Sequence, residues 1–205
     1  MPTDDHHYFT IANTETRLLA GIEQASESFA RQRGLLCRQS LAPDLLARLV
    51  KASDSVSFVS NPVKGLGHRW IERPSRVGAA IELTLNRPVL VNWLRTVTGC
   101  SLEGKIEGRL VETRAGGTDQ LDWHDDKIMN AQFGITLHLR ERQYDGGAFE
   151  LRDRMTRETL FRHDDPAPGD LVVFEVKRRS EHRVMPVQSG EARRVFTGWF
   201  ISPSN

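Results

Sequence analysis

The stretch GDLVVFEVKRRSEHRVMPVQSGEARRVFTGWF, residues 169–200, decides the fold predicted for this chain. It contains an apolar strand at residues 171–176 and leads, after a turn at Ser189-Gly190, into an aromatic strand at residues 195–201. Short apolar runs bounded by Gly, Asp and Pro are typical of strands in all-β domains. This part of the chain is therefore predicted to be β-structure.

Short apolar runs bounded by Gly, Asp and Pro also occur between residue 105 and this stretch, so the predicted β-region begins at residue 105. This pattern predicts further strands at residues 133–140, 148–152 and 158–162. About eight short strands of this kind favour a double-stranded β-helix, or jelly roll. We therefore predict a jelly-roll core in residues 105–201.

The N-terminal half has a different hydrophobic period. Helical spacing of apolar residues is typical of amphipathic helices, and it predicts helices at residues 10–32, 41–53, 76–85 and 88–97. A short strand is expected at residues 34–37 and a loop at 61–67. The expected fold class is α+β with a mainly β core, built as one domain over residues 1–205. Residues 1–100 form its mainly helical lead-in, an N-terminal helical layer.

The charge composition bears on whether the protein binds nucleic acid or membranes. Of 205 residues, 28 are Lys or Arg and 27 are Asp or Glu, so the formal charge is +1. A nearly neutral chain has no general attraction to nucleic acid or to an anionic membrane, and neither partner is expected. The N-terminus lacks the basic and apolar segments of a secretory signal. With only Cys37 and Cys100 and no disulfide framework, a cytoplasmic location is expected.

Metal-ligating residue types lie close together in Trp123-His124-Asp125-Asp126. On a β-strand, residues two apart share a face, so His124 and Asp126 could reach one ion while Asp125 points away. Two histidines and one carboxylate leave open positions for a cosubstrate and O2, which suits non-haem Fe(II). The His-x-Asp tripeptide alone also fits a polar strand end.

The C-terminal motifs strengthen the metal interpretation. Gly169-Asp170 opens a strand, His182 is followed by Val184-Met185-Pro186-Val187, and an arginine begins the strand that ends in Trp199-Phe200. This pattern resembles the C-terminal half of the 2-oxoglutarate/Fe(II)-dependent dioxygenases, in the prolyl 4-hydroxylase-like branch. The resemblance covers roughly residues 105–201.

The resemblance implies roles for particular residues. His124, Asp126 and His182 would bind Fe(II) and form the catalytic centre. Arg193 would bind the distal carboxylate of 2-oxoglutarate, since its planar guanidinium meets a carboxylate with two parallel hydrogen bonds.

Spacing separates Arg193 from its neighbour Arg194. In the family the arginine precedes a hydroxyl residue by four positions and a tryptophan by six, which Thr197 and Trp199 satisfy for Arg193. Strand alternation also places Arg193, Thr197 and Trp199 on one face. Arg114 stands near the position of a family tyrosine that touches the cosubstrate, and we expect Arg114 to line the pocket.

The implied activity is that of an Fe(II)- and 2-oxoglutarate-dependent dioxygenase that uses O2 and releases succinate and CO2. The expected outcome is hydroxylation of an aliphatic C–H of a small molecule or an amino-acid residue. Two alternatives remain open: a cupin-like metalloenzyme that does not use 2-oxoglutarate, and a catalytically silent jelly-roll binding module. The segment His68-Arg69-Trp70 is a weaker candidate for shaping substrate access, and His138 is expected to face solvent or the pocket.

Overall fold

The computed structural model describes residues 7–19, 21–116, 119–126, 130–140, 143–176 and 179–203. Its helices are α1 (Ile22–Gln32), α2 (Pro43–Asp54), α3 (Val77–Leu85) and α4 (Pro88–Thr98). The strands that precede the last helix are β1 (Phe9–Ile11), β2 (Thr16–Leu18), β3 (Gly34–Cys37), β4 (Phe58–Val63) and β5 (Gly67–Glu72). The remaining strands are β6 (Lys105–Thr113), β7 (Gln120–His124), β8 (Ala131–His138), β9 (Tyr144–Gly146), β10 (Phe149–Asp153), β11 (Thr159–His163), β12 (Leu171–Glu175), β13 (Ser180–Val184), β14 (Val187–Gly190) and β15 (Arg193–Ile201).

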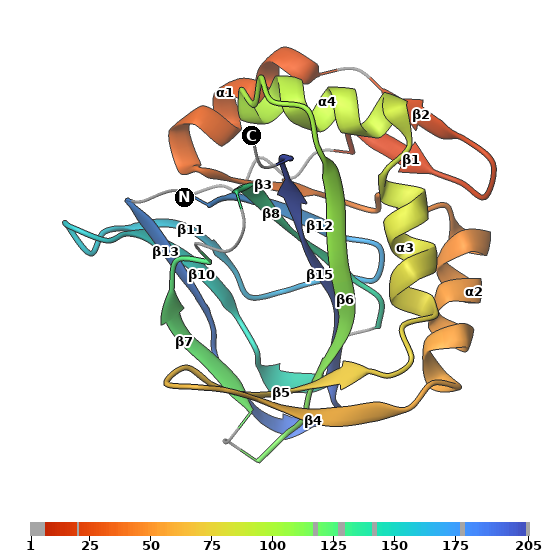
Figure 1. Ribbon diagram of the computed structural model, residues 1–205, viewed down its shortest axis with the longest axis vertical. Helices are drawn as coiled ribbons and strands as arrows, with labels where there is room; N and C mark the ends of the chain where they lie inside the picture. The colour runs from red at the N-terminus through yellow and green to blue at the C-terminus, as the bar shows by residue number, and fades with distance from the viewer. Residues whose placement is uncertain are drawn as a thin grey trace.

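One antiparallel sheet of 11 strands dominates the molecule and curls into a barrel-like jelly roll (Figure 1). Its order is β11-β10-β13-β7-β5-β6-β15-β8-β12-β3, and β4 pairs with β5 at the side. Strand β5 joins the two halves of the barrel, because it pairs with β6 through Trp70 and Ile71 and with β7 through Gly67 and His68. The predicted jelly roll, with its N-terminal helical layer, is confirmed.

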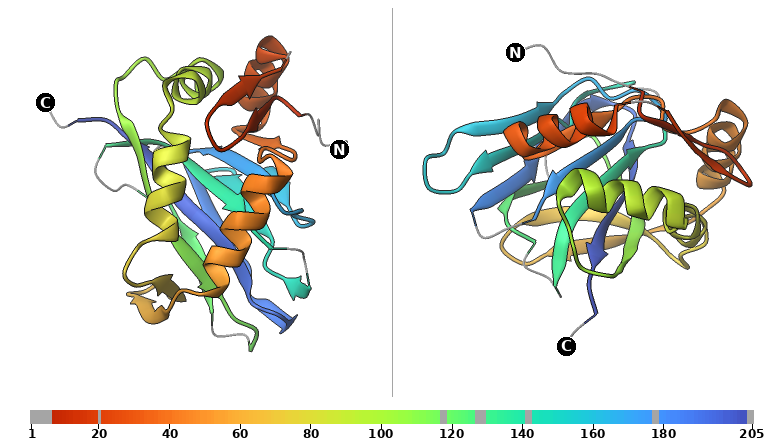
Figure 2. Two further views of the ribbon diagram at one scale, coloured as in Figure 1. Left: turned by 90° about the vertical axis from the view of Figure 1, so that its right-hand side faces the viewer. Right: turned by 90° about the horizontal axis from the view of Figure 1, so that it is seen from above.

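The helices cover the outer face of the half that contains β6, β15, β8 and β12 (Figure 2). On β12, Leu171 and Val173 pack under the helices, whereas Val172 and Phe174 point into the barrel. Strands that are buried on both faces read as continuous apolar runs, as this one does. The interior cluster consists of Leu36, Phe149, Leu151, Phe161, Val172, Phe174, Val176 and Trp199. Within the described residues, no helix is long and apolar enough to cross a membrane.

The last two helices begin and end close to where the sequence predicts. Pro88 lies at the start of α4, where its fixed φ suits the first turn and its missing N–H is not needed. The start of α3 is held by Glu72 of β5, whose carboxylate accepts hydrogen bonds from the backbone N–H groups of Arg76, Val77 and Gly78 at 2.7–2.9 Å. A carboxylate at a helix N-terminus satisfies donors that have no partner within the helix. This contact ties β5 to the helical layer.

The N-terminal half contains more strand than predicted. Residues 10–32 do not form one helix, because β1 and β2 pair as a hairpin and Gly21, with φ 96°, precedes the start of α1. The predicted loop at 61–67 is also wrong, since β4 and β5 pair across it and only the turn at residues 64–66 remains. Pro62 is tolerated because β4 pairs on one side only and proline lacks an N–H to donate.

Candidate active site

His124 and His182 face each other across two paired strands. They are directly opposite in the antiparallel pair of β7 and β13, and their ring centroids lie 4.2 Å apart. Directly opposite residues in an antiparallel pair carry side chains on the same face at close range. The strand register therefore brings together two histidines that are distant in the sequence.

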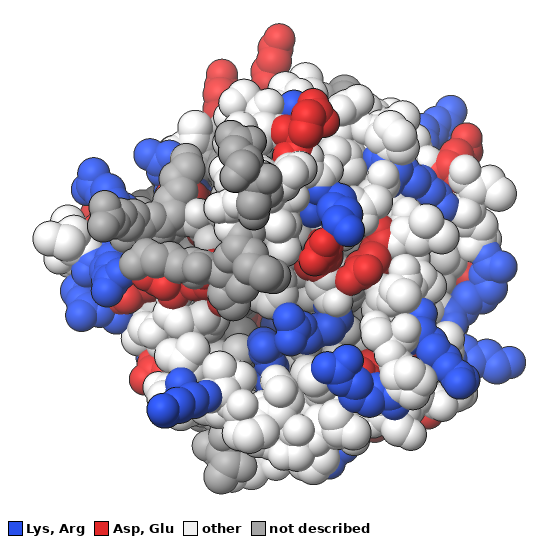
Figure 3. Space-filling model, viewed as in Figure 1, with Lys and Arg blue, Asp and Glu red and all other residues white. Residues whose placement is uncertain are grey.

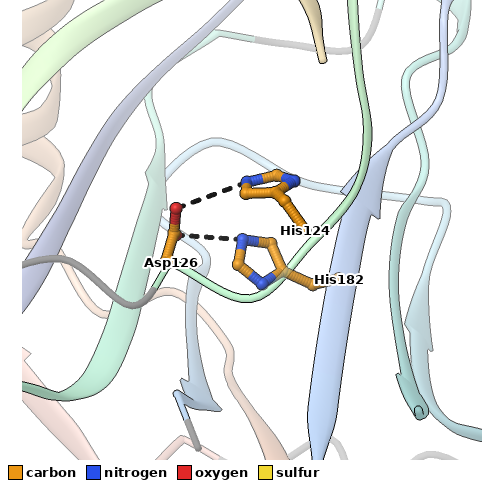
Figure 4. Close-up of side chains that lie close together, drawn as sticks. All are labelled: His124, Asp126 and His182. Atoms are coloured by element: carbon orange, nitrogen blue, oxygen red, sulfur yellow. Dashed lines mark ion pairs between the residues drawn. The ribbon is translucent and has the colours of Figure 1, made fainter. Parts of the chain in front are cut away.

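Asp126 completes the cluster from a turn. Its carboxylate lies 3.4 Å from Nε2 of His124 and 3.1 Å from Nε2 of His182, and Figure 4 shows the three side chains pointing toward one another. One ligand atom from each residue lies within 4.8 Å of the others. A metal ion held by all three fits this spacing.

The predicted reason for the proximity of His124 and Asp126 is wrong. Strand β7 ends at His124, so Asp126 does not share a strand face with it. Instead Asp126 has φ 41°, a left-handed conformation that Asp adopts more readily than most residues. Asp125 forms an ion pair with Arg154 at 2.9 Å, and it is absent from the cluster.

Hydrogen bonding prepares His124 for a metal. Its Nδ1–H donates to the carbonyl oxygen of Asp122 at 2.6 Å, which leaves the lone pair on Nε2, the atom that faces Asp126. Such a bond on the second ring nitrogen fixes the tautomer and the orientation of a metal-binding histidine. Burial, followed by the neighbouring His182, lowers the pKa of His124, so the neutral ligand form is favoured.

Asp126 is held in its ionised form despite burial. Burial raises the pKa of its carboxyl, but the hydrogen bond from His182, the charges of the two histidines and the bond from Trp199 outweigh this effect and lower the pKa to about 2. The indole Nε1–H of Trp199 donates to Oδ2 of Asp126 at 2.7 Å. The predicted site residue Trp199 thus contacts the acidic member of the cluster.

The cluster opens into a cavity inside the barrel that encloses about 540 Å³, including the part open to solvent. Thr197, Trp199 and Arg193 of β15 line this cavity together with the three clustered residues. Arg193 is only 3% exposed, and its Nε has no hydrogen-bond partner. Burial lowers the pKa of Arg193, while a hydrogen bond with Tyr144 opposes that change.

Arg193 lacks a carboxylate partner among the residues that the structure describes. A buried cation is stable only when a counter-charge or several acceptors compensate for its lost hydration. Its surroundings are tightly packed, since a Cβ added at Gly147 would lie 2.9 Å from Cδ of Arg193. The side chain is therefore fixed in position and suited to an anion that enters the cavity.

Arg194 points to the opposite side of β15. Its guanidinium donates to Glu112 at 2.6 Å, to Asp54 at 2.9 Å and to the carbonyl oxygen of Ser53 at 2.8 Å. These contacts engage both terminal nitrogens of Arg194 in joining α2 to the sheet, while its Nε has no hydrogen-bond partner. Strand alternation thus places Arg193, and not Arg194, at the cavity.

Arg114 is the predicted cofactor-binding residue that the structure does not bring to the cavity. Its Nε donates to Glu112 at 2.8 Å, and its guanidinium stacks on the ring of Trp70 with 3.6 Å between the cation and the ring centroid. These two partners hold the side chain on the outer side of the sheet edge. The expected pocket role of Arg114 is therefore withdrawn.

Two residues of β5 enter the site more directly than predicted. His68 and Arg69 line the cavity. His68 is fixed at both ring nitrogens, by Asp119 at 2.6 Å and by Ser60 at 2.8 Å. The sequence signal of His68 and Arg69 is weak because the pattern predicts a loop at residues 61–67, directly before them. His138 is 3% exposed and does not line the cavity, so the expectation that it faces solvent or the pocket is wrong.

Comparison with known proteins agrees with the site. The model of the 2OG-Fe(II) oxygenase superfamily matches residues 110–201, which include all three clustered residues and Arg193. No curated protein matches the chain by sequence.

Solved structures share the fold. A prolyl-4-hydroxylase from Pseudomonas putida has 20% identity and a TM-score of 0.66, covering 89% of this chain and 100% of that one. An oxidoreductase of the 2OG-Fe(II) oxygenase family from Burkholderia pseudomallei has 13% identity and a TM-score of 0.70, covering 99% and 100%. EvdO2 from Micromonospora carbonacea, complexed with 2-oxoglutarate, has 17% identity and a TM-score of 0.57, covering 88% and 90%. Over residues 110–201 the chain is thus similar to the 2OG-Fe(II) oxygenase superfamily, which indicates an oxidoreductase that uses Fe(II), 2-oxoglutarate and O2, and the solved structures share its fold.

Proposed function

We propose that His124, Asp126 and His182 bind the Fe(II) of this oxygenase. The observation that carries the proposal is the convergence of the three ligand atoms within 4.8 Å at the cavity. Two imidazoles and one carboxylate are a ligand set that suits non-haem Fe(II) and would leave room on the metal for the cosubstrate and O2. The Asp122 carbonyl and the Trp199 indole hold two of the ligands in place.

Arg193 is proposed to bind the distal carboxylate of 2-oxoglutarate. The buried guanidinium with its unpaired Nε fits a carboxylate that approaches through the cavity. Thr197 lines the cavity on the same strand, and its hydroxyl could donate to that carboxylate. The bound metal and cosubstrate supply the oxidation, in which 2-oxoglutarate is converted to succinate and CO2.

The protein's own residues provide position and exclusion of water. Phe149, Phe174 and Val195 line the same cavity as the polar groups. Apolar walls limit the entry of water, and the low dielectric strengthens the contacts of Arg193 and Asp126 with their ligands.

The proposed reaction is hydroxylation of an aliphatic C–H in a small molecule or an amino-acid residue. The cavity lies inside the barrel and is lined by apolar and aromatic side chains with a few polar groups among them, which is the usual composition of small-molecule sites. The near-neutral charge of +1 supports a substrate other than nucleic acid and a site of action away from membranes. The presence of only two cysteines supports a cytoplasmic location.

An anaerobic titration tests the proposal. Metal-free protein receives Fe(II) and then 2-oxoglutarate, and the visible charge-transfer band of the chelated cosubstrate is recorded. We expect the band in the wild type, and we expect Arg193→Ala to need at least about tenfold more 2-oxoglutarate, because a charged hydrogen-bond pair is lost. Arg114→Ala is the matched control, since that guanidinium lies outside the cavity, and its titration should follow the wild type.

The outcomes separate the alternatives. A band that is unchanged in Arg193→Ala would assign the distal carboxylate to another residue. Absence of any band, with Fe(II) still bound, would favour a cupin-like metalloenzyme. Failure to bind Fe(II) would favour a silent binding module and contradict the assignment of His124, Asp126 and His182.

A further inference from the structure

Most arginines that are buried or half-buried in the described residues have an acidic partner. Six of them form ion pairs with carboxylates: Arg38, Arg95, Arg140, Arg152, Arg183 and Arg194. Arg87 instead donates to three backbone carbonyl oxygens. Within the described part of the chain, Arg69, Arg109 and Arg193 differ because no carboxylate lies within ion-pair distance of them.

These three arginines adjoin the same cavity. Arg69 and Arg193 line it directly. Arg109 shares a face of β6 with Val111 and Thr113, which also line it, because alternate residues of a strand point the same way. The proposed function accounts for Arg193 but leaves the other two cations without a role.

Arg69 lies on β5 between the residues that pair with β6 and those that pair with β7. It lines the same cavity as the cluster of His124, Asp126 and His182. Its Nε donates to Oδ1 of Asn61 at 3.2 Å. Within the described residues its two terminal nitrogens have no protein acceptor, so they remain available to a ligand in the cavity. Burial, followed by the charge of Arg109, lowers the pKa of Arg69 to about 10, while Asp126 opposes the change. Two neighbouring cations thus repel each other at the edge of the cavity.

Arg109 approaches from the adjacent strand. Its guanidinium lies over the ring of Trp199, 5.5 Å from the ring centroid, and the indole of Trp199 is bonded to Asp126. Stacking of this kind orients a guanidinium without neutralising it. In Figure 3, Lys and Arg side chains gather over the lower part of β6 and over β5, on the face shown.

We propose that Arg69 and Arg109 form a subsite for a carboxylate of the primary substrate, so that the enzyme acts on a small acidic molecule. The inference rests on the proposed function, in which Arg193 is occupied by the cosubstrate. A carboxylate between the two guanidinium groups offsets their repulsion and uses the donors that no acceptor among the described residues takes. It also anchors the substrate beside the cluster of His124, Asp126 and His182, since Arg69 lines the same cavity as these three residues.

The experiment compares acids with matched neutral molecules. The probes are the standard L-amino acids and short 2-hydroxy acids, each tested beside its primary amide, with the Fe(II)- and 2-oxoglutarate-loaded enzyme. Two signals are recorded: the change in the charge-transfer band under anaerobic conditions, and succinate formation above the substrate-free rate in air. We expect at least one acid to give both signals, and its amide to need at least about tenfold higher concentration.

Variants assign the effect to the two arginines. Arg69→Gln and Arg109→Gln should each raise the half-saturating concentration of that acid by about tenfold. They should leave the response to the amide and the half-saturation by 2-oxoglutarate within about twofold of the wild type. Arg109→Lys keeps the charge and should recover part of the loss. Arg48→Gln, an exposed position on α2, is the matched control and should behave as the wild type.

Either of two results would overturn the inference. One is an equal response of every acid and its amide, including no response to either, in samples whose charge-transfer band is normal. The other is a change in the half-saturation by 2-oxoglutarate, and not by the acid, in the Arg69 and Arg109 variants. Loss of the band in the wild type is a separate outcome, which contradicts the proposed function itself.

Discussion

A single hydrogen bond connects the metal cluster to the strand that carries Arg193. The indole of Trp199 on β15 donates to Asp126, which belongs to the turn after β7. Without this donor, one carboxylate oxygen would lose a fixed partner in a buried setting, and the aspartate could rotate. In the proposed Fe(II) site, Trp199 would therefore act through Asp126, as a positioning residue.

We expect Trp199→Phe to weaken Fe(II) binding by about tenfold to a hundredfold, the usual effect of removing a partner of a metal ligand. The ring remains, so the packing of β15 should be preserved. Competition with a chelator of known affinity measures the change under anaerobic conditions. Trp70→Phe serves as the control because Trp70 lies against the guanidinium of Arg114 and meets His68 edge to face, and it does not line the cavity. Equal Fe(II) affinity in Trp199→Phe and the wild type would contradict the positioning role.

At the residue scale, the sequence predicts the members of the cluster better than the reason for their proximity. His124, Asp126 and His182 were each predicted from short motifs, and the structure brings them together. The left-handed backbone of Asp126 could not be predicted, because strand β7 ends at His124 and the tripeptide itself does not fix the φ of a residue beyond the strand. Arg69 belongs only to a weak candidate segment in the sequence, and what distinguishes it in the structure is the absence of a carboxylate partner among the described residues.

At the element scale, strand β15 places the adjacent side chains of Arg193 and Arg194 on opposite faces, where they have different roles. Arg193 faces the cavity with an unpaired Nε, and Arg194 joins Glu112, Asp54 and Ser53 on the outer side. The alternation of a strand is enough to predict this division from the sequence. This division predicts that a substitution of Arg194 lowers the stability of the fold, whereas a substitution of Arg193 weakens the binding of 2-oxoglutarate.

We expect Arg194→Met to lower the free energy of unfolding by about 3–5 kcal/mol, the usual effect of breaking a buried ion pair and leaving one charge behind. Arg193→Met should cost little or raise stability in the absence of 2-oxoglutarate, because it removes a buried cation that has no carboxylate partner in the described structure. Urea denaturation of the metal-free variants measures both changes.

The effects of the two substitutions should be reversed when stabilisation by 2-oxoglutarate is measured. Arg193→Met should lose the stabilisation that Fe(II) and 2-oxoglutarate give the wild type, while the folded fraction of Arg194→Met should retain it. If Arg193→Met destabilised the metal-free protein as much as Arg194→Met, Arg193 would be a structural residue.

The prediction of secondary structure from the sequence fails where a strand pairs with strands that are distant in the sequence. The helices α2 and α4 have apolar spacing and begin with proline, and α3 is a short apolar helix; the sequence predicts each of the three to within a few residues. The hairpin of β4 and β5 was taken in part for a loop because Asn61 and Pro62 are poor strand formers. Pairing of β5 with β6 and β7 overrides that local preference.

At the scale of the whole molecule, closure of the sheet buries polar groups beyond the site. His138 on β8 is 3% exposed, its Nε2 has no hydrogen-bond partner, and its ring meets His163 of β11 edge to face. The charged or titratable groups near it are Arg193 of β15, His163 of β11 and Arg38, which follows β3. These groups come from separate parts of the sheet, so the environment of His138 depends on the complete fold.

Burial, and then the charges of Arg193, His163 and Arg38, lower the pKa of His138 well below 6.5. Below pH 6.5 the unfolded chain therefore binds a proton that the folded chain does not, and the free energy of unfolding must fall as the pH falls. The full contribution is present above pH 6.5. We expect a decrease of up to about 1.4 kcal/mol per pH unit from this histidine between pH 6.5 and 5, and His124 adds a decrease of the same sign in metal-free protein.

Urea denaturation of chelator-treated protein at several pH values between 7 and 5 measures this slope. His138→Gln removes the titrating group and should flatten the slope by up to one proton, whatever its effect on stability at pH 7. Val173→Ala, in the buried part of β12, is the matched control: it should lower stability at every pH through lost packing and keep the wild-type slope. A slope in His138→Gln as steep as in the wild type would show that His138 accepts a proton in the folded state, which its enclosure by Arg193 and His163 opposes.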